Sequence, residues 1–245
     1  MNAITRGVVA AAAALPLMAL PACGGDEDNP QWTTPCAVVL DGSGSGTKLD
    51  VEGLMKERLG EFLVDKHCGA VAFAPITGSS GSSKCDIDSV VLDQAHQPGD
   101  DVAANRADAL DVALEGAATM LACAQKDEYK ASDILGGIDR AVGGRPPGDG
   151  VYEMLVISDF AQTDATMNLY KEKLDDKQRR EELIAELKAD ARVPNLSGTQ
   201  ITAYGFGKGF SKVPGRTNLL LAFWNELITG AGGPVLDLRG QKLDQ

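Results

Sequence analysis

The chain has 245 residues, of which 44% are hydrophobic, and its formal net charge at pH 7 is −12. The hydrophobic fraction is enough for a buried core, and the length suits one α/β domain. The acidic balance argues against nucleic acid and against anionic lipid headgroups as partners, because both are negatively charged.

The first residues follow the order of a secretory signal. Arg6 is the only charged side chain ahead of an apolar run from Val8 to Leu20 that is rich in Ala and Leu. This run of about 13 residues is too short for a membrane span, which needs roughly 20, but it suits the apolar part of a signal peptide. It leads into Leu20-Pro21-Ala22-Cys23-Gly24, which resembles the lipobox of bacterial lipoproteins.

The lipobox resemblance implies that residues 1–22 are a signal peptide and that Cys23 becomes a new N-terminus carrying acyl chains such as palmitate. More than one acyl chain anchors a protein stably, so we expect the chain on the extracytoplasmic face of the cell membrane, held there by lipid alone. The alternative is ordinary secretion with a free Cys23. Residues 23–34 contain Gly24-Gly25, several acidic or polar side chains and Pro30, so they are expected to be a flexible tether.

Residues 35–240 are expected to form one folded domain, followed by a tail at 241–245. Within the domain, six short apolar runs predict buried strands: Cys36–Leu40, Ala70–Phe73, Val90–Leu92, Met154–Ile157, Ile201–Tyr204 and Val235–Leu238. Most of these runs are continuous rather than alternating, which is typical of a parallel sheet covered on both faces. The link from Phe73 to Val90 contains the Gly- and Ser-rich segment 78–83 and leaves no room for a crossover helix, so we expect the third strand to be an antiparallel edge strand.

Five stretches between the strands have the spacing of helices: Lys48–Val64, Ala104–Ala124, Ile134–Ala141, Asn168–Ala189 and Asn218–Thr229. The alternation of strands and helices predicts an α/β fold with a doubly wound, mostly parallel six-stranded sheet and helices on both faces. The stretch Asn168–Ala189 is highly charged. We expect Asp176 and Arg180 to pair one helical turn apart, on a face that is simply solvated.

The first strand ends in Asp41-Gly42-Ser43-Gly44-Ser45. In an open α/β sheet, ligands bind beyond the carboxyl ends of the strands, and this segment occupies that position. It offers a carboxylate and two hydroxyls, separated by glycines that let the backbone curl around a small object. Oxygen ligands of this kind suit a hard divalent cation, Mg²⁺ above all, with Mn²⁺ and Ca²⁺ as alternatives.

The pattern Asp-x-Ser-x-Ser after an apolar strand resembles the first element of the metal-ion-dependent adhesion site in von Willebrand factor A domains. Ser132 stands where that family has a Thr, in the loop before the helix at Ile134, and Asp159 directly follows the strand Met154–Ile157. The resemblance covers residues 35–238 and implies a Rossmann-type fold. It also implies that Asp159 acts through water and that four side chains lie close to the metal: Asp41, Ser43, Ser45 and Ser132.

The family resemblance implies metal-dependent binding and not catalysis. Neutral hydroxyls leave much of the metal's charge uncompensated, so an Asp or Glu of a partner can complete its coordination. We therefore expect a monomeric adhesion module that binds a protein ligand with exposed Asp or Glu. Two alternatives stay open. One is a lipoprotein that captures a small ligand or solute, with or without hydrolase activity. The other is a scaffold whose metal site is vestigial, because Ser132 replaces Thr.

Four cysteines follow Cys23: Cys36, Cys68, Cys85 and Cys123. An even number outside the cytoplasm indicates two disulfides, although the sequence by itself leaves their connectivity open. In the fold that the resemblance implies, Cys36 and Cys68 begin neighbouring strands and could bridge, which leaves Cys85 for Cys123. A zinc site that includes His67 or His96 is the rival interpretation, but no Cys-x-x-Cys pair supports it.

Two histidines have other interpretations. His67 precedes Cys68, and a Cys–His nucleophile there is the less favoured alternative to a disulfide. His96 lies in a loop rich in Gln and Pro and is expected to be exposed.

Overall fold

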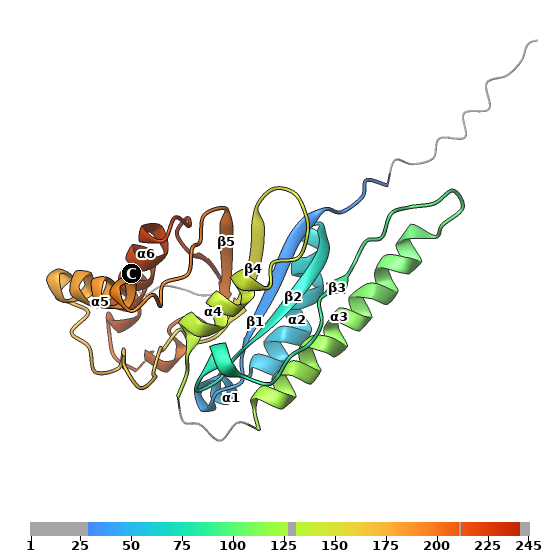
Figure 1. Cartoon of the computed structure of the whole chain (residues 1–245). Coiled ribbons are helices and arrows are strands. Elements are labelled where there is room, and N and C mark those ends of the chain that lie inside the picture. Colours follow the sequence, from blue (N-terminus) through green and yellow to red (C-terminus); the bar gives the residue numbers. More distant parts are fainter. Residues whose placement is uncertain (1–28, 127–130, 211, 241–245) are drawn as a thin grey trace, which may run out of the picture. The chain divides into compact units, whose positions relative to one another are not determined.

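The computed structural model describes residues 29–126, 131–210 and 212–240 (Figure 1). Contacts group the chain from Gln31 onward into one unit. The predicted signal peptide, the predicted lipidation site Cys23 and the predicted tail at 241–245 lie outside the described residues. Among the described helices, none is both long enough and apolar enough to cross a bilayer.

A six-stranded sheet with the strand order β3-β2-β1-β4-β5-β6 forms the centre of this unit. Its strands are β1 (Thr34–Asp41), β2 (Cys68–Ile76), β3 (Val90–Val91), β4 (Tyr152–Ile157), β5 (Thr199–Tyr204) and β6 (Asp237–Arg239). Neighbouring strands pair in parallel, except that β3 pairs antiparallel with β2 at one edge. The predicted doubly wound sheet and its antiparallel edge strand are confirmed.

Helices cover both faces of the sheet (Figure 1). The long helices are α2 (Val51–Asp65), α3 (Val102–Ala124), α4 (Ile134–Gly143), α5 (Lys177–Ala189) and α6 (Arg216–Gly230). α2 and α3 pack on one face, and α4, α5 and α6 pack on the other. Successive residues of β1 enter different cores, Val38 on the first face and Val39 on the second. Because neither face of β1 meets water, its sequence is continuously apolar.

The predicted helix Lys48–Val64 is in fact two helices, α1 (Gly44–Leu49) and α2. Between them, Asp50 has a left-handed backbone with φ of 59°, and its carboxylate accepts a hydrogen bond from the Gly53 amide at 3.1 Å. Asp adopts this conformation more readily than most residues because its short side chain can bond to the nearby backbone. The break allows α1 to begin inside the loop that follows β1.

The predicted helix Asn168–Ala189 is wrong over its first part. α5 begins only at Lys177, and the chain before it forms turns. Asp176 caps the helix, because its carboxylate accepts hydrogen bonds from two amides of the first turn. The predicted pairing of Asp176 with Arg180 is therefore also wrong. Arg180 is buried and pairs instead with Glu226 on α6, at 2.8 Å.

Both predicted disulfides are present. Cys36–Cys68 joins the beginnings of β1 and β2, and Cys85–Cys123 joins the loop before β3 to the end of α3. These four sulfurs are thereby engaged, so neither the zinc interpretation nor the Cys–His nucleophile has one of them available. His67 packs edge-on against the Trp32 ring.

A buried carboxylate, Asp93, ties the start of the domain to α3. It accepts hydrogen bonds from the Trp32 amide at 2.6 Å and from the Arg106 guanidinium at 2.7 Å, and that guanidinium lies over the Trp32 ring. His96 is not exposed as predicted: it is partly buried, with Nε2 2.8 Å from Asp93 Oδ1. Burial acts to raise the pKa of Asp93, but these three hydrogen bonds outweigh burial and lower the pKa below its ordinary value.

Breaking the Asp93 cluster is expected to destabilise the fold strongly. Asp93→Asn removes the charge with which the buried Arg106 pairs, so we expect the free energy of unfolding to fall by about 3 kcal/mol. Asp237→Asn is the matched control, because the Asp237–Arg239 pair is more exposed. Its expected loss is below about 1 kcal/mol. Denaturant unfolding with the disulfides intact measures both variants, and equal losses would contradict a structural role for the cluster.

Candidate metal centre

The predicted metal ligands gather at the carboxyl ends of the two central strands. β1 ends at Asp41, and β4 ends at Ile157, immediately before Ser158 and Asp159. The two strands pair in parallel with Leu40 opposite Ile157, so both ends lie at the same edge of the sheet. Ser158 Oγ donates a hydrogen bond to Asp41 Oδ2 at 2.7 Å. The two loops are therefore joined directly beneath the candidate site.

Two glycines of the first loop are required by close packing. A Cβ on Gly42 would lie 2.4 Å from the Cβ of Ala124 at the end of α3, and a Cβ on Gly46 would lie 2.0 Å from the Asp41 carbonyl oxygen. Neither contact is sterically permitted. The glycines therefore let the loop curl back tightly over the end of β1, so that its two serines reach the same space.

Ser132 is fixed between two other loops. Its amide donates to the Thr163 carbonyl at 2.7 Å, and the Thr163 amide donates back to the Ser132 carbonyl at 2.9 Å. The next residue, Asp133, donates its amide to the Thr77 carbonyl at 2.8 Å and caps α4 by accepting from the Gly136 amide at 3.1 Å. Backbone bonds to the loop after β4 and to the end of β2 thus set the position of the Ser132 hydroxyl.

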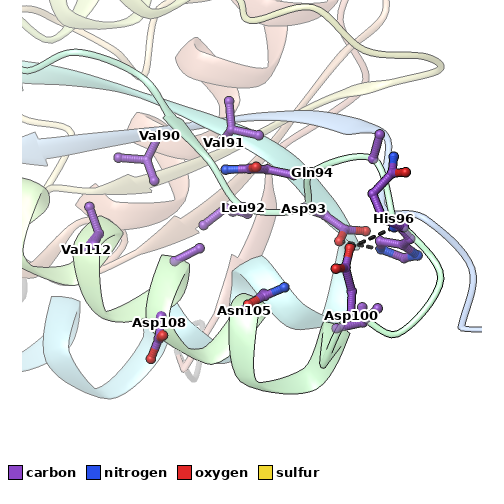
Figure 2. Close-up of a pocket in the computed structure, with 14 residues that line it drawn as sticks. Val90, Val91, Leu92, Asp93, Gln94, His96, Asp100, Asn105, Asp108 and Val112 are labelled. Carbon is purple, nitrogen blue, oxygen red and sulfur yellow. Dashed lines mark hydrogen bonds and ion pairs between the residues drawn. The ribbon is translucent and has the colours of Figure 1, made fainter.

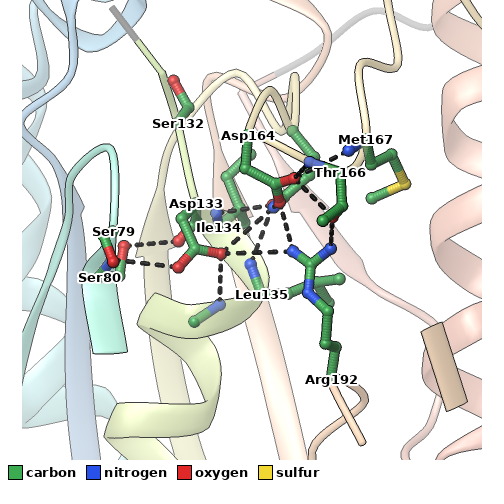
Figure 3. Close-up of polar contacts among 12 residues, drawn as sticks. Ser79, Ser80, Ser132, Asp133, Ile134, Leu135, Asp164, Thr166, Met167 and Arg192 are labelled. Carbon is green, nitrogen blue, oxygen red and sulfur yellow. Dashed lines mark hydrogen bonds and ion pairs between the residues drawn. The ribbon is translucent and has the colours of Figure 1, made fainter. Parts of the chain in front are cut away.

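Gln162 organises the start of α4 next to this serine. Its side chain is buried, and its Oε1 accepts hydrogen bonds from the amides of Ile134 at 2.7 Å and Leu135 at 3.0 Å. These two amides of the first turn are therefore satisfied inside the protein and do not point towards a ligand. Beside these amides, Asp164 forms an ion pair with Arg192 (Figure 3).

Ser43, Ser45 and Ser132 bring three hydroxyl oxygens together, and we call this set the hydroxyl triangle. The Oγ–Oγ distances are 2.7 Å between Ser43 and Ser132, 3.1 Å between Ser43 and Ser45, and 3.4 Å between Ser45 and Ser132. Neighbouring oxygens around an octahedral Mg²⁺ lie about 3.0 Å apart, because each is about 2.1 Å from the ion and adjacent ligands form a right angle. The hydroxyl triangle therefore fits one face of such an octahedron.

Asp41 is fully buried behind the hydroxyl triangle. Its Oδ1 accepts from the Ser43 amide at 3.0 Å and from Ser43 Oγ at 2.5 Å, while its Oδ2 accepts from Ser158. Burial raises the pKa of Asp41 to about 6, even though the hydrogen bonds from Ser43 and Ser158 act in the opposite direction. With both oxygens engaged, the carboxylate acts on the site through Ser43, whose proton it draws away from the hydroxyl triangle.

Asp159 lies beside the hydroxyl triangle and is also buried. Its Oδ1 accepts from the Ala161 amide at 2.9 Å, and its Oδ2 lies 3.5 Å from the Tyr170 hydroxyl. Burial raises the pKa of Asp159, and hydrogen bonds from Ala161, Tyr170 and Ser45 oppose that rise. Asp159 and Ser45 also line the same cavity, which places this second carboxylate beside the hydroxyl triangle.

The donor set suits a hard divalent cation. The described residues contain no group of three or more His, Cys, Asp or Glu side chains placed to hold a metal ion. Three neutral hydroxyls with two buried carboxylates beside them converge instead. Hard oxygen donors of this kind fit Mg²⁺, with Mn²⁺ and Ca²⁺ as alternatives, and do not fit zinc, which prefers nitrogen and sulfur. The low charge among the closest donors predicts weak binding.

Four residues that shape the centre are not singled out by sequence reasoning: Ser158, Gln162, Thr163 and Tyr170. A usable signal exists for Ser158, because it directly follows an apolar strand at the ligand-binding edge. Gln162 and Thr163 act on a helix and a loop that are distant in sequence, which no local pattern reveals. Tyr170 lies in the stretch that is wrongly predicted as helix.

A separate cavity of about 590 Å³ lies between β3 and α3 (Figure 2). The exposed apolar side chains of Val91 and Val112 line it, together with the polar side chains of Asp93 and His96. Asp93 and His96 belong to the structural cluster described above. The volume of this cavity is therefore the only support for the alternative of small-ligand capture. The described residues that line it form no catalytic arrangement.

Comparison with models of known protein families finds none that matches this chain, and no curated protein is significantly similar to it. The resemblance to von Willebrand factor A domains is carried by the motif residues and by the order of strands and helices. Family membership therefore stays a proposal.

The packing of the first loop against α3 predicts the effect of a single methyl group. Gly42→Ala places a Cβ against Ala124, so we expect the free energy of unfolding to fall by about 1–3 kcal/mol. At Gly44, nothing lies within 4 Å of an added Cβ. Gly44→Ala is therefore the control and should be neutral or stabilising by up to about 1 kcal/mol. Denaturant unfolding in EDTA measures both, and a tolerated Gly42→Ala would refute the packing.

Asp41→Asn is expected to stabilise the metal-free protein at pH 7. The pKa of Asp41 is about 6 in the fold, against an ordinary value of 3.8, so its protonated form favours folding. That contribution is complete below about pH 4 and is lost as the pH rises through about 6, which leaves an unfavourable carboxylate at pH 7. We expect the variant to exceed the wild type in free energy of unfolding by roughly 1–2 kcal/mol at pH 7, and the gain to vanish near pH 4.

The measurement is denaturant unfolding in EDTA across this pH range. Asp111→Asn, on the exposed side of α3, is the control, and its difference from the wild type should not change with pH. If Asp41→Asn lowers the free energy of unfolding by the same amount at pH 4 and at pH 7, burial does not disfavour the Asp41 charge.

Proposed function

We propose that this chain is a von Willebrand factor A-like domain that binds a protein partner through a Mg²⁺-type metal site. The observation that carries the proposal is the hydroxyl triangle of Ser43, Ser45 and Ser132, whose spacing fits one face of an octahedron. Its position at the carboxyl ends of β1 and β4 adds support, because ligands of open α/β sheets bind at that edge.

The role of the protein side chains follows from their charges. A bound Mg²⁺ would supply positive charge and an open coordination position that accepts a carboxylate oxygen. The three serine hydroxyls are neutral, so they would hold the ion without cancelling its charge. Asp41 orients the Ser43 hydroxyl, and Asp159 lies beside Ser45 on the neighbouring loop. The arrangement favours binding an Asp or Glu of the partner, so the proposed activity is binding and not catalysis.

The proposed location is the extracytoplasmic face of the cell membrane. It rests on the lipobox-like sequence around Cys23, with acyl chains as the only membrane attachment. The disulfides Cys36–Cys68 and Cys85–Cys123 support it, because such bonds persist in oxidising compartments. We propose that the domain acts as a monomer there, as an adhesion or capture module.

Isothermal titration of the purified protein with Mg²⁺ and with Mn²⁺ tests the metal site. We expect a dissociation constant of about 1 mM or below for the wild type, as in other weak extracellular sites. Ser132→Ala should weaken binding by about tenfold or more because it removes one donor oxygen. Ser132→Thr keeps the hydroxyl and should bind at least as well as the wild type.

Ser79→Ala is the matched control, since it deletes an exposed hydroxyl outside the hydroxyl triangle. It should leave metal affinity unchanged. No heat of binding at millimolar Mg²⁺ or Mn²⁺ would refute the metal mechanism and leave a scaffold with a vestigial site as the surviving function. If metal binds, retention of partner proteins with Mg²⁺ and their release by EDTA would test the adhesive role.

A further inference from the structure

A cavity of about 360 Å³ adjoins the candidate metal centre, with Ser45 and Asp159 in its wall. Three lysines also line it: Lys48, Lys208 and Lys212. All three are exposed, and among the described lining residues Asp159 is the only acid. In a chain with a net charge of −12, this place is a local reversal of sign. We call it the lysine cavity.

The three lysines come from two segments that are far apart in sequence. Lys48 lies near the end of α1, and Lys208 begins the short helix η2 (Lys208–Phe210) after β5. Lys212 follows shortly after η2. The left-handed residue Asp50 separates α1 from α2 shortly after Lys48. Two independent segments therefore bring like charges to the same opening, although they repel one another.

The wall of the lysine cavity is built by packed side chains. The Tyr170 ring stacks on the Phe210 ring with 4.4 Å between centroids. Arg216 fixes the turn that carries Tyr170, because its guanidinium donates to the carbonyls of Leu169 at 2.7 Å and Glu172 at 2.6 Å. The aromatic wall is thus held in place by ring stacking and by hydrogen bonds to the backbone, while the lysines are exposed.

Gly209 packs closely against the side chains between the lysine cavity and the metal centre. A Cβ at this position would lie 2.4 Å from the Tyr170 hydroxyl and 2.7 Å from Asp159 Oδ2. Any side chain at 209 would press on the carboxylate and the phenol that separate the two spaces. The lysine cavity therefore adjoins the metal centre at Ser45 and Asp159.

We propose that the lysine cavity binds additional carboxylates of the same partner segment, so that the preferred ligand is a run of neighbouring Asp or Glu residues on a protein. This inference rests on the proposed function, in which the first carboxylate is bound at the hydroxyl triangle. In an extended segment, side chains two residues apart point the same way and lie about 7 Å apart, so alternate acidic residues of a run can reach two neighbouring subsites. Lysine ammonium groups attract carboxylates without a fixed geometry, and the Leu49 and Tyr170 side chains offer apolar contact to the methylenes of Glu.

The test compares two fluorescently labelled peptides by polarisation at saturating Mg²⁺ and low salt. One peptide is hexaglutamate, and the other has the same length with a single Glu among Gln residues. The test variant replaces three residues by Gln: Lys48, Lys208 and Lys212. The control variant removes the same charge from exposed lysines elsewhere on the helices: Lys56, Lys177 and Lys188.

We expect the wild type to bind hexaglutamate about tenfold more tightly than the single-Glu peptide, because several weak ion pairs add up. The test variant should lose that preference, and the control variant should keep it. Because the subsites are exposed, 0.5 M salt should also reduce the preference.

Each failure has a distinct signature. The inference about the lysine cavity is overturned if the preference for hexaglutamate survives in the test variant, or if the control variant loses it equally. In either case, Mg²⁺-dependent binding of both peptides leaves the proposed function standing. Binding that is equally tight in EDTA overturns the proposed function and this inference with it. No measurable binding of hexaglutamate at millimolar peptide and Mg²⁺ also overturns the inference.

Discussion

The parallel pairing of β1 with β4 is the constraint on which the rest of the candidate site depends. It sets Leu40 opposite Ile157, so the residues that follow each strand emerge side by side at one edge of the sheet. The hydrogen bond from Ser158 to Asp41 then joins the two loops, and through Asp41 it orients Ser43. Without this register, the motif at the end of β1 would be a Gly- and Ser-rich turn with no counterpart across the sheet.

The buried charges of the candidate metal centre destabilise the metal-free fold. Burial disfavours the charge on Asp41, and the negative charge of Asp159 disfavours it further. Hydroxyls and an amide hold Asp41, and these bonds compensate its desolvation only in part. A divalent cation at the hydroxyl triangle would favour the ionised form of both carboxylates. Residues that destabilise a fold are expected at functional sites, where the function and not stability determines the residue. The buried charge of Asp41 therefore supports a ligand-binding role.

The sheet and the loop motif could be predicted from the sequence because local residue patterns indicate both. Continuous apolar runs mark strands buried on both faces, and the Asp41 motif directly follows one of them. The wrong elements have specific causes. The charged stretch before Lys177 has helix-forming composition, but Asp176 caps α5 and stops it from extending backwards. Helical spacing across Asp50 hides a left-handed residue whose own side chain restarts the helix.

Contacts between distant segments explain the remaining differences. Ser132 could be placed in a loop before a helix, but its pairing with Thr163 depends on the path of the chain after β4. Tyr170 lies in the turns that precede α5, and from there its hydroxyl reaches Asp159. The same turns supply the wall against which Phe210 stacks, so the part of the chain that sequence patterns describe least well shapes the space beside the candidate metal. For the acidic partner proposed above, this local reversal of charge would favour the encounter, because repulsion from a chain of net charge −12 otherwise opposes it.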